Sequence, residues 1–536
     1  MVTCFLPGYL LYAAFLREEC DTAETQYAIA FALSIPVVAT IHFVTFVTGR
    51  NEPLTNGILY VLVVGALYLG ARARRADLAL PSAGPAILFA LFSLYCTLLL
   101  TITPAYAAAY MYDWGLYYPN MFFYLRQVDP SVFSEGIPME YLVRRTPFFS
   151  LVNAFFLAFS GNTYAAFQAV STFLNSLIFW AVLVTADRFC GRKTAKLALL
   201  LLPVVPIIIC RIPIPTPKPV SAYLLLLTFV TYHRLRSRKP GESAGPAPAL
   251  VAILAVTSYM VHPMSLLYLA WLGLDYLWLA TRKRVAPEPR LIAWGVAALL
   301  LLVVPWFAWA LARFGIERVL VPSYTISENP LPPLTYVSSR ITILAATCLV
   351  PEPLTHAMLY SAQRAPGVTR LVYWGHPLLR TYLETFLGGF TFTGAAFLVI
   401  SWLRTRKPAR EGMRALLSWA ALGAATCLAV HFLVDLKGLA FNIMAPLVVL
   451  FLVFLCHQAV QMPRRFLHAM ASLVLCEYVF VRFLVYRLTL PAPRPAPHVF
   501  DVVRAALPFP VALFVSITGV SLIMVLYVTA VARQEE

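Results

Sequence analysis

The sequence is poor in charge: only 12% of its 536 residues are Asp, Glu, Lys or Arg, whereas 60% are hydrophobic. A soluble domain carries roughly 25% charged residues. This composition, with a mean hydropathy of +0.77, excludes an ordinary soluble enzyme. The signatures GxxxxGKS/T, GxGxxG and HExxH are also absent. No nucleotide-binding domain or zinc-protease site is therefore indicated.

Cysteines at the spacing of a metal or redox site are lacking too. The nine cysteines are scattered, mostly within apolar runs, and no CxxC pair occurs. Neither a zinc site nor a disulfide framework is therefore indicated. The first apolar run, at 4–16, has no basic segment before it, so we expect no cleavable signal peptide. This run is either a short first span or a half-buried entry helix.

Long apolar runs are what the sequence has in abundance. A spanning helix needs about 20 apolar residues. The candidate spans are 4–16, 27–48, 55–71, 84–108, 164–186, 195–210, 219–235, 248–262, 263–280, 291–312, 381–403, 414–434, 438–459, 465–487 and 507–531. Only His262-Pro263 separates 248–262 from 263–280, and the short run at 148–159 lies in the interface or re-enters. We predict an all-α, polytopic transmembrane helical bundle of about 12–15 helices, whose outer loops carry short interfacial helices.

Basic residues predict the orientation of these spans. The net charge is +17, and its placement at the ends of apolar runs is typical of topology signals, not of nucleic-acid binding. Seven clusters would face the cytoplasm: Arg72/Arg74/Arg75, Arg188/Arg192/Lys193/Lys196, Arg234/Arg236/Arg238/Lys239, Arg282/Lys283/Arg284/Arg290, Arg404/Arg406/Lys407/Arg410/Arg414, Arg464/Arg465 and Arg533. We therefore expect a multi-pass plasma-membrane protein with its long loops and its active site on the extracytoplasmic side.

This layout divides the chain into four regions. They are N-terminal extra spans at 1–80, a transmembrane core at 81–312 with a first outer loop at 109–147, an outer and re-entrant region at 313–380, and C-terminal spans at 381–536. The third region is too long for a plain connector, and loops of that length are usually functional or disordered.

The first outer loop holds the strongest candidate for chemistry. Asp113 stands a few residues past the apolar run 85–108, where an acid is costly unless something uses it. We interpret it as a general base or as a metal or acceptor ligand; the alternative is a solvated loop carboxylate. The aromatic residues around it suit sugar stacking, although interfacial belts also favour Tyr and Trp. These aromatic residues are Tyr110, Tyr112, Trp114, Tyr117 and Tyr118.

Two arginines close the same loop. Arg144 and Arg145 stand just before Thr146-Pro147 and the next apolar helix. Basic residues are usually in excess on the cytoplasmic side, so two guanidiniums on the outer face need an explanation. A bidentate phosphate clamp would explain them. Pairing with Glu135 or Glu140 is the alternative.

A proline-rich segment and a histidine complete the candidates. The segment 210–220, CRIPIPTPKPV, contains Arg211 and Lys218 and cannot be helical throughout. It would hold a cation rigidly at the outer membrane face, as a phosphate ligand or within a charged reverse turn. His262, in YMVHPMS, is a functional candidate because it is intramembrane; the alternative is a packed residue at a helix break.

Taken in order, these elements resemble the membrane-embedded GT-C glycosyltransferases, which include protein O-mannosyltransferases and lipid A aminoarabinose transferases. The shared layout is a helix, a long first outer loop with an Asp near its start, and a basic-Pro element before a short helix. Here these are the run 85–108, Asp113, and Arg144-Arg145-Thr146-Pro147 before FFSLVNAFFLAFSGN. The resemblance covers 85–235 well and the rest by general layout.

The resemblance implies inverting transfer of a sugar from a polyprenyl-phosphate carrier to an extracytoplasmic lipid, glycan or protein acceptor. Asp113 would be catalytic. The donor phosphate would bind Arg144, Arg145, Arg211 and Lys218, and the sugar or acceptor would contact Tyr112, Trp114, Tyr117, Tyr118 and His262. The sequence leaves a requirement for Mg²⁺ or Mn²⁺ open, because Trp114-Gly115-Leu116 follow Asp113 where better-known members have Glu and then Arg.

Three other activities are weighed against this one. A carrier or flippase for a lipid-linked intermediate would need inverted repeats and mid-membrane charges, neither of which the sequence shows clearly. A polymerase or ligase of surface polysaccharide would share the many helices and outer arginines in a different fold. A membrane O-acyltransferase would depend on His262 or His431.

Overall fold

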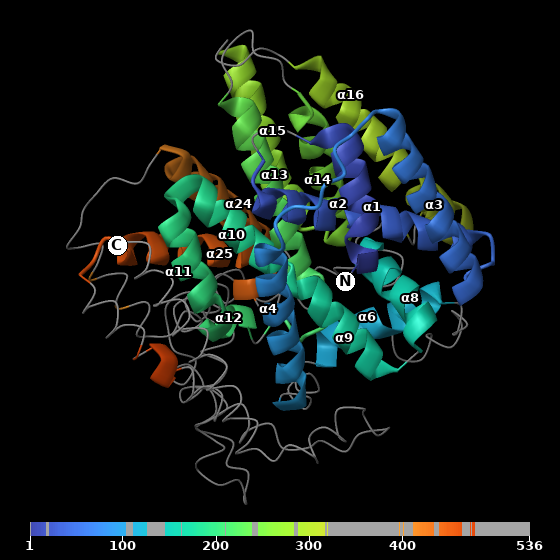
Figure 1. Cartoon of the computed structure of the whole chain (residues 1–536), viewed down its shortest axis with the longest axis horizontal. Coiled ribbons are helices and arrows are strands. Elements are labelled where there is room, and N and C mark those ends of the chain that lie inside the picture. The colour runs from blue at the N-terminus through green and yellow to red at the C-terminus, as the bar shows by residue number, and fades with distance from the viewer. Residues whose placement is uncertain are drawn as a thin grey trace, which may run out of the picture.

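The computed structural model describes residues 2–17, 21–102, 111–125, 145–161, 163–209, 211–237, 245–282, 288–316, 411–433 and 439–463, with isolated positions at 319, 396, 400, 472 and 474–477. Within these ranges every regular element is a helix and none is a strand (Figure 1). The all-α class predicted from the sequence is confirmed.

Most of the described helices lie within the first 236 residues. They are η1 (Val2–Cys4), α1 (Leu6–Leu11), η2 (Tyr12–Leu16), α2 (Ala23–Val47), α3 (Pro53–Ala73), α4 (Ala83–Ile102), α6 (Met111–Tyr124), α8 (Phe148–Ser160), α9 (Tyr164–Ser176), α10 (Ile178–Cys190), α11 (Arg192–Leu201), η4 (Leu202–Val204), α12 (Pro206–Ile209) and α13 (Lys218–Arg236). Those that follow are α14 (Ala247–Val261), α15 (Ser265–Thr281), α16 (Pro289–Ala298), η5 (Leu299–Val303), α17 (Val304–Phe314), α24 (Glu411–Leu433) and α25 (Leu439–Ala459).

Four helical stretches in the described ranges are long and apolar enough to cross a membrane: Ala23–Val47, Pro53–Ala73, Ala166–Cys190 and Pro289–Phe314. The first and third are mostly buried and form the core of the bundle, whereas the second and fourth are mostly exposed. Apolar faces exposed over a whole helix fit lipid, not water. The chain is therefore a helical membrane protein with a packed centre and two lipid-facing flanks.

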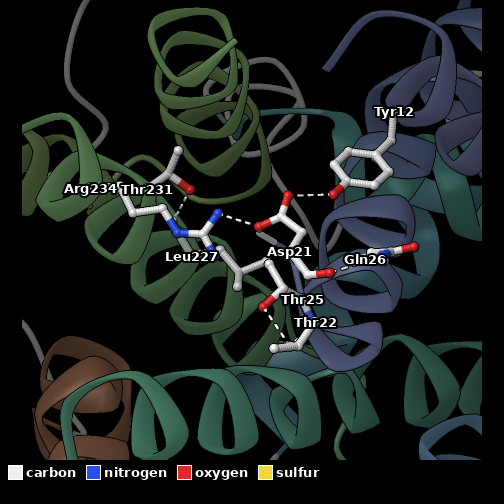
Figure 2. Close-up of polar contacts among 8 residues, drawn as sticks. All are labelled: Tyr12, Asp21, Thr22, Thr25, Gln26, Leu227, Thr231 and Arg234. Carbon is white, nitrogen blue, oxygen red and sulfur yellow. Dashed lines mark hydrogen bonds and ion pairs between the residues drawn. The ribbon is translucent and has the colours of Figure 1, made fainter. Parts of the chain in front are cut away.

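Ion pairs hold together one end of the bundle, which we call the basic end. Just before α2, the Asp21 carboxylate accepts hydrogen bonds from Arg234 at the end of α13 and from Tyr12 in η2 (Figure 2). Glu24, in the first turn of α2, pairs with Arg192 at the start of α11. Three segments far apart in the sequence thus converge on the start of α2, and the cations that predicted orientation also stabilise the fold.

The opposite end of the bundle, which we call the loop end, carries the proline-rich segment. Helix α13 has 19 residues, so Lys218 at its start lies about 28 Å from Arg236 at its end. The Ser221 and Ser265 hydroxyls are 2.7 Å apart, which places the start of α15 beside the start of α13. Because Asp275, near the end of α15, bonds Arg236 and Tyr232 of α13, α15 runs from the loop end to the basic end.

The region 248–280 therefore consists of two antiparallel helices, not one kinked helix. The predicted span at 195–210 is also wrong as a single helix. Helix α11 ends at Leu201, a 3-10 turn follows, and α12 is a separate short helix. Pro203 and Pro206 explain the breaks, because proline removes a backbone donor and clashes with the preceding turn. The predicted spans at 381–403, 465–487 and 507–531, and the 313–380 region, lie outside the described residues except for isolated positions.

Candidate functional site

The predicted first outer loop begins with a helix, and the N-terminal helices hold that helix in place. The Tyr124 carbonyl at the end of α6 accepts hydrogen bonds from His42 Nε2 (3.2 Å) and Asn51 Nδ2 (3.0 Å). Since a carbonyl only accepts, His42 Nε2 is the donor in this contact. The Trp306 indole donates to the Tyr124 hydroxyl at 3.2 Å. Helix α6 is thus fixed at the loop end by α2, by the segment before α3, and by α17.

Several predicted site residues fall on or beyond the edge of what is described. Tyr112, Asp113 and Trp114 have backbone positions within α6, but their side chains are outside the described part. Arg144 lies outside it altogether, as do Glu135 and Glu140. The expectation that Asp113 stands in a loop is corrected, since its backbone is helical.

Arg145 and Tyr117 form the first contact at which predicted site residues meet. Arg145 Nη1 donates to the Tyr117 hydroxyl at 2.6 Å, and its guanidinium carbon lies 4.8 Å from the centre of the Tyr117 ring. The same ring meets Phe149 of α8 edge to face, with 5.7 Å between centroids. A cation over a tyrosine ring is attracted by the ring quadrupole. The contact orients Arg145 at the beginning of α8.

Tyr118 connects this contact to α9. Its ring lies 5.2 Å from that of Phe167, centroid to centroid. Burial raises the pKa of the Tyr118 hydroxyl above its ordinary value, so the group stays protonated at neutral pH. Phe167 is followed by Gln168, whose amide Nε2 donates to the Pro213 carbonyl at 3.2 Å. Helix α9 therefore contacts both segments in which the sequence predicted site residues.

The proline-rich segment is buried along 211–217 and is held by amide side chains of α9. Asn175 Nδ2 donates to the carbonyls of Ile212 (3.0 Å) and Ile214 (2.9 Å). Prolines remove backbone donors but leave the carbonyls, and a buried carbonyl needs a partner. The segment therefore packs inside the helical bundle, and its location at the outer membrane face stays a prediction.

Two cations enter the interior with this segment. Arg211 is 8% exposed and Lys218 is 7% exposed. Transfer of a cation into an apolar interior is costly, and such groups are kept where they are paired or where they bind an anion. The Ile214 N–H donates to the Arg211 carbonyl at 3.1 Å, so Arg211 does lie in a reverse turn, but a buried one. The arrangement offers buried positive charge at the loop end.

The sequence reasoning missed a polar stripe on α9. Its members are Gln168, Ser171, Thr172, Asn175 and Ser176, and all are buried. Their spacing of three, four, seven and eight residues places them on one helix face, a pattern that average hydropathy over 164–186 conceals. The Ser171 hydroxyl donates to Asn153 Oδ1 of α8 at 2.9 Å. The stripe thus faces both α8 and the proline-rich segment.

His262 forms the break between α14 and α15. Its backbone is extended (φ −154°, ψ 122°), its N–H donates to the Ser258 carbonyl, and its carbonyl accepts from Ser265. Its side chain is half-buried at the loop end. The backbone geometry agrees with the helix-break interpretation and leaves acceptor binding as a prediction.

A metal site is not built by the side chains that the structure describes. No three His, Cys, Asp or Glu residues among them lie together in a group that could hold an ion. The expectation of Mg²⁺ or Mn²⁺ therefore depends on Asp113, and no step below involves a metal.

Comparisons with known proteins give a remote likeness in fold. No family model matches the chain, and no curated protein matches it. Crystal structures of ArnT from Cupriavidus metallidurans are similar, one bound to undecaprenyl phosphate and one in the apo state. Both are 14% identical with a TM-score of 0.46; the first covers 85% of this chain and 73% of ArnT, the second 83% and 75%. This likeness concerns the arrangement of helices and no individual residue.

Proposed function

We propose that the protein is an integral-membrane glycosyltransferase that moves a sugar from a polyprenyl-phosphate carrier to an acceptor on the extracytoplasmic side, with the loop end outermost. The observation that carries this proposal is the burial of Arg211 and Lys218 in a segment fixed by α9. Helix α9 also meets α6 through Phe167 and Tyr118. Helix α9 thus connects the proline-rich segment with α6, the helix whose Tyr117 contacts Arg145.

The chemistry needs a group that stabilises phosphate as it leaves. In the proposed step the acceptor oxygen attacks the anomeric carbon, and the bond from that carbon to the phosphate oxygen breaks with its electron pair on the phosphate. Arg145, Arg211 and Lys218 would stabilise the developing negative charge. Arg145 stands at the start of α8, where the helix dipole also favours an anion. Asp113 would accept the proton of the acceptor hydroxyl.

Binding of the carrier lipid tests the cations directly. Undecaprenyl phosphate, which is bound in one of the ArnT structures, is a suitable probe for the full-length chain in nanodiscs. Lys218→Met and Arg211→Met should each weaken its binding about tenfold to a hundredfold, because a hydrogen bond to a charged group contributes about 1.5–3 kcal/mol. Arg282→Met, an exposed cation after α15, is the matched control and should bind normally. Unchanged affinity in both interior variants would refute the proposal.

Asp113→Asn tests the catalytic assignment separately. Membranes that contain this variant should bind the carrier lipid normally, yet transfer no sugar from a panel of polyprenyl-phosphate sugars. Helix content and expression should match those of the unaltered chain, because the amide has nearly the shape of the carboxylate. Near-normal transfer would remove Asp113 from the mechanism while leaving the phosphate site in place.

A further inference from the structure

Three buried polar side chains near the start of α8 have no hydrogen-bond partner among the residues that the structure describes. They are Asn120 of α6, which is 0% exposed, Thr146, which is 6% exposed, and Ser150 of α8, which is 1% exposed. Both amide atoms of Asn120 and both hydroxyl oxygens are unpartnered. Leaving such groups unsatisfied costs free energy, and native interiors seldom do so. A cluster of them therefore indicates a place where a ligand supplies the missing partners.

The three residues lie close along the chain to those that form the contact between Arg145 and Tyr117. Thr146 directly follows Arg145, and Ser150 directly follows Phe149, whose ring meets that of Tyr117. Asn120 lies three residues beyond Tyr117, one turn along the same face of α6. Helices α6 and α8 are neighbours, so the amide and the two hydroxyls stand on, or just before, the two helices that the contact between Arg145 and Tyr117 joins.

The kind of atom left without a partner defines the chemical class of the ligand. A phosphate dianion only accepts hydrogen bonds, so it would leave the Asn120 Oδ1 acceptor unsatisfied. A sugar hydroxyl both donates and accepts, and it matches an amide and two hydroxyls equally well. We propose that Asn120, Thr146 and Ser150 bind hydroxyl groups of the transferred sugar beside the phosphate bound by Arg145. This inference rests on the proposed function.

A site of this kind determines which donors are accepted. When a pocket is built to hydrogen-bond a hydroxyl, a ligand without that group leaves the polar atoms of the pocket unpaired and is strongly rejected. The protein therefore prefers the glycosylated carrier to the bare carrier lipid, and it prefers a fully hydroxylated sugar to a deoxy sugar.

The test replaces each polar group by an apolar one of similar size: Asn120→Leu, Thr146→Val and Ser150→Ala. Affinity is measured in nanodiscs for undecaprenyl phosphate and for the same lipid carrying glucose, galactose or mannose. We expect at least one sugar to raise the affinity of the unaltered chain tenfold or more. Each variant should reduce that preference about threefold to tenfold, the share of one neutral hydrogen bond, and leave binding of the bare lipid unchanged.

Thermal unfolding of the ligand-free variants supplies a second readout. Removal of an unsatisfied buried polar atom should leave the unfolding temperature equal or higher, whereas removal of a structural group would lower it. The matched control is Thr185→Val on α10, whose buried hydroxyl is also unpartnered. This control should gain stability in the same way without any change in sugar preference.

Each contrary outcome has a definite meaning. Equal loss of affinity for the bare and glycosylated lipids would show phosphate contacts and overturn the hydroxyl assignment. Lower stability with an unchanged sugar preference, or no preference in the unaltered chain, would overturn it as well. If Lys218→Met still lowers the affinity for the bare lipid in those cases, the proposed function is kept and only the sugar site is rejected.

Discussion

The basic end and the loop end of the bundle both bury charge, but they surround it differently. At the basic end Arg234, Arg192 and Arg236 each meet a carboxylate of the same chain. At the loop end Arg145 lies over an aromatic ring, and Lys218 lies in a buried segment whose carbonyls are bonded by neutral amides. The ion pairs at the basic end stabilise the fold, whereas we propose that the buried cations at the loop end bind an anion from outside.

The largest effect that would distinguish the two ends is expected on the free energy of unfolding when Asp21 is substituted. Asp21→Ala leaves the largely buried Arg234 without its carboxylate, and breaking a buried ion pair from one side costs about 3–5 kcal/mol. The free energy of unfolding in detergent should fall by that amount, while carrier-lipid affinity of the folded fraction stays the same. If stability were unchanged and lipid affinity fell, the basic end would bind the carrier lipid and the assignment of the two ends would be wrong.

A moderate effect is expected from Asn175, which holds the proline-rich segment. Asn175→Ala removes two hydrogen bonds to carbonyls of that segment, each worth about 1 kcal/mol. Because Arg211 and Lys218 flank these carbonyls, affinity for undecaprenyl phosphate should fall about tenfold. Thr172→Val is the control: it lies on the same face of α9 but bonds only the Gln168 carbonyl of its own helix. Equal losses in the two variants would argue against a specific role in positioning.

The smallest effect is expected from Asp77, which forms an exposed ion pair with Arg17 at the basic end. A hydrogen bond from the Ala79 backbone N–H, with help from Arg17, holds the pKa of Asp77 below its ordinary value. A lowered pKa means that any stabilisation is present above the ordinary carboxyl pKa and is lost as the pH falls through the lowered one. Asp77→Asn should therefore differ from the unaltered chain only slightly at pH 7 and not at all in acid. Unfolding curves at both pH values and at high salt, where exposed pairs are screened, check this.

The sequence predicted those parts of the fold that depend on continuous composition. The runs 27–48 and 55–71 correspond closely to α2 and α3, because an uninterrupted apolar stretch of this length has few alternatives to a membrane helix. It failed at 195–210, where average hydropathy is high but Pro203 and Pro206 divide the stretch. The apolar runs predicted that these segments are helices. They did not predict where single proline residues divide a run into separate helices.

The candidate site was predictable in part. The side-chain types and their positions in the sequence predicted Arg145, Arg211 and Lys218 as phosphate ligands. They also predicted the aromatic neighbours of Asp113 as sugar ligands. The burial of the proline-rich segment was not predictable, since it depends on Asn175, which stands 36 positions before Arg211 in the chain. Asn120 and Ser150 had no signal of their own, because one polar residue in an apolar helix has no distinctive spacing. Only tertiary packing reveals that such a group lacks a partner.

The Tyr124 carbonyl has a consequence for how the molecule is made. Its two donors, His42 and Asn51, lie in α2 and just before α3, which are synthesised before α6. A nascent α6 therefore meets a docking surface that is already in place. A shortened chain without α2 and α3 would have to place the helix that bears Tyr117 without these two hydrogen-bond donors.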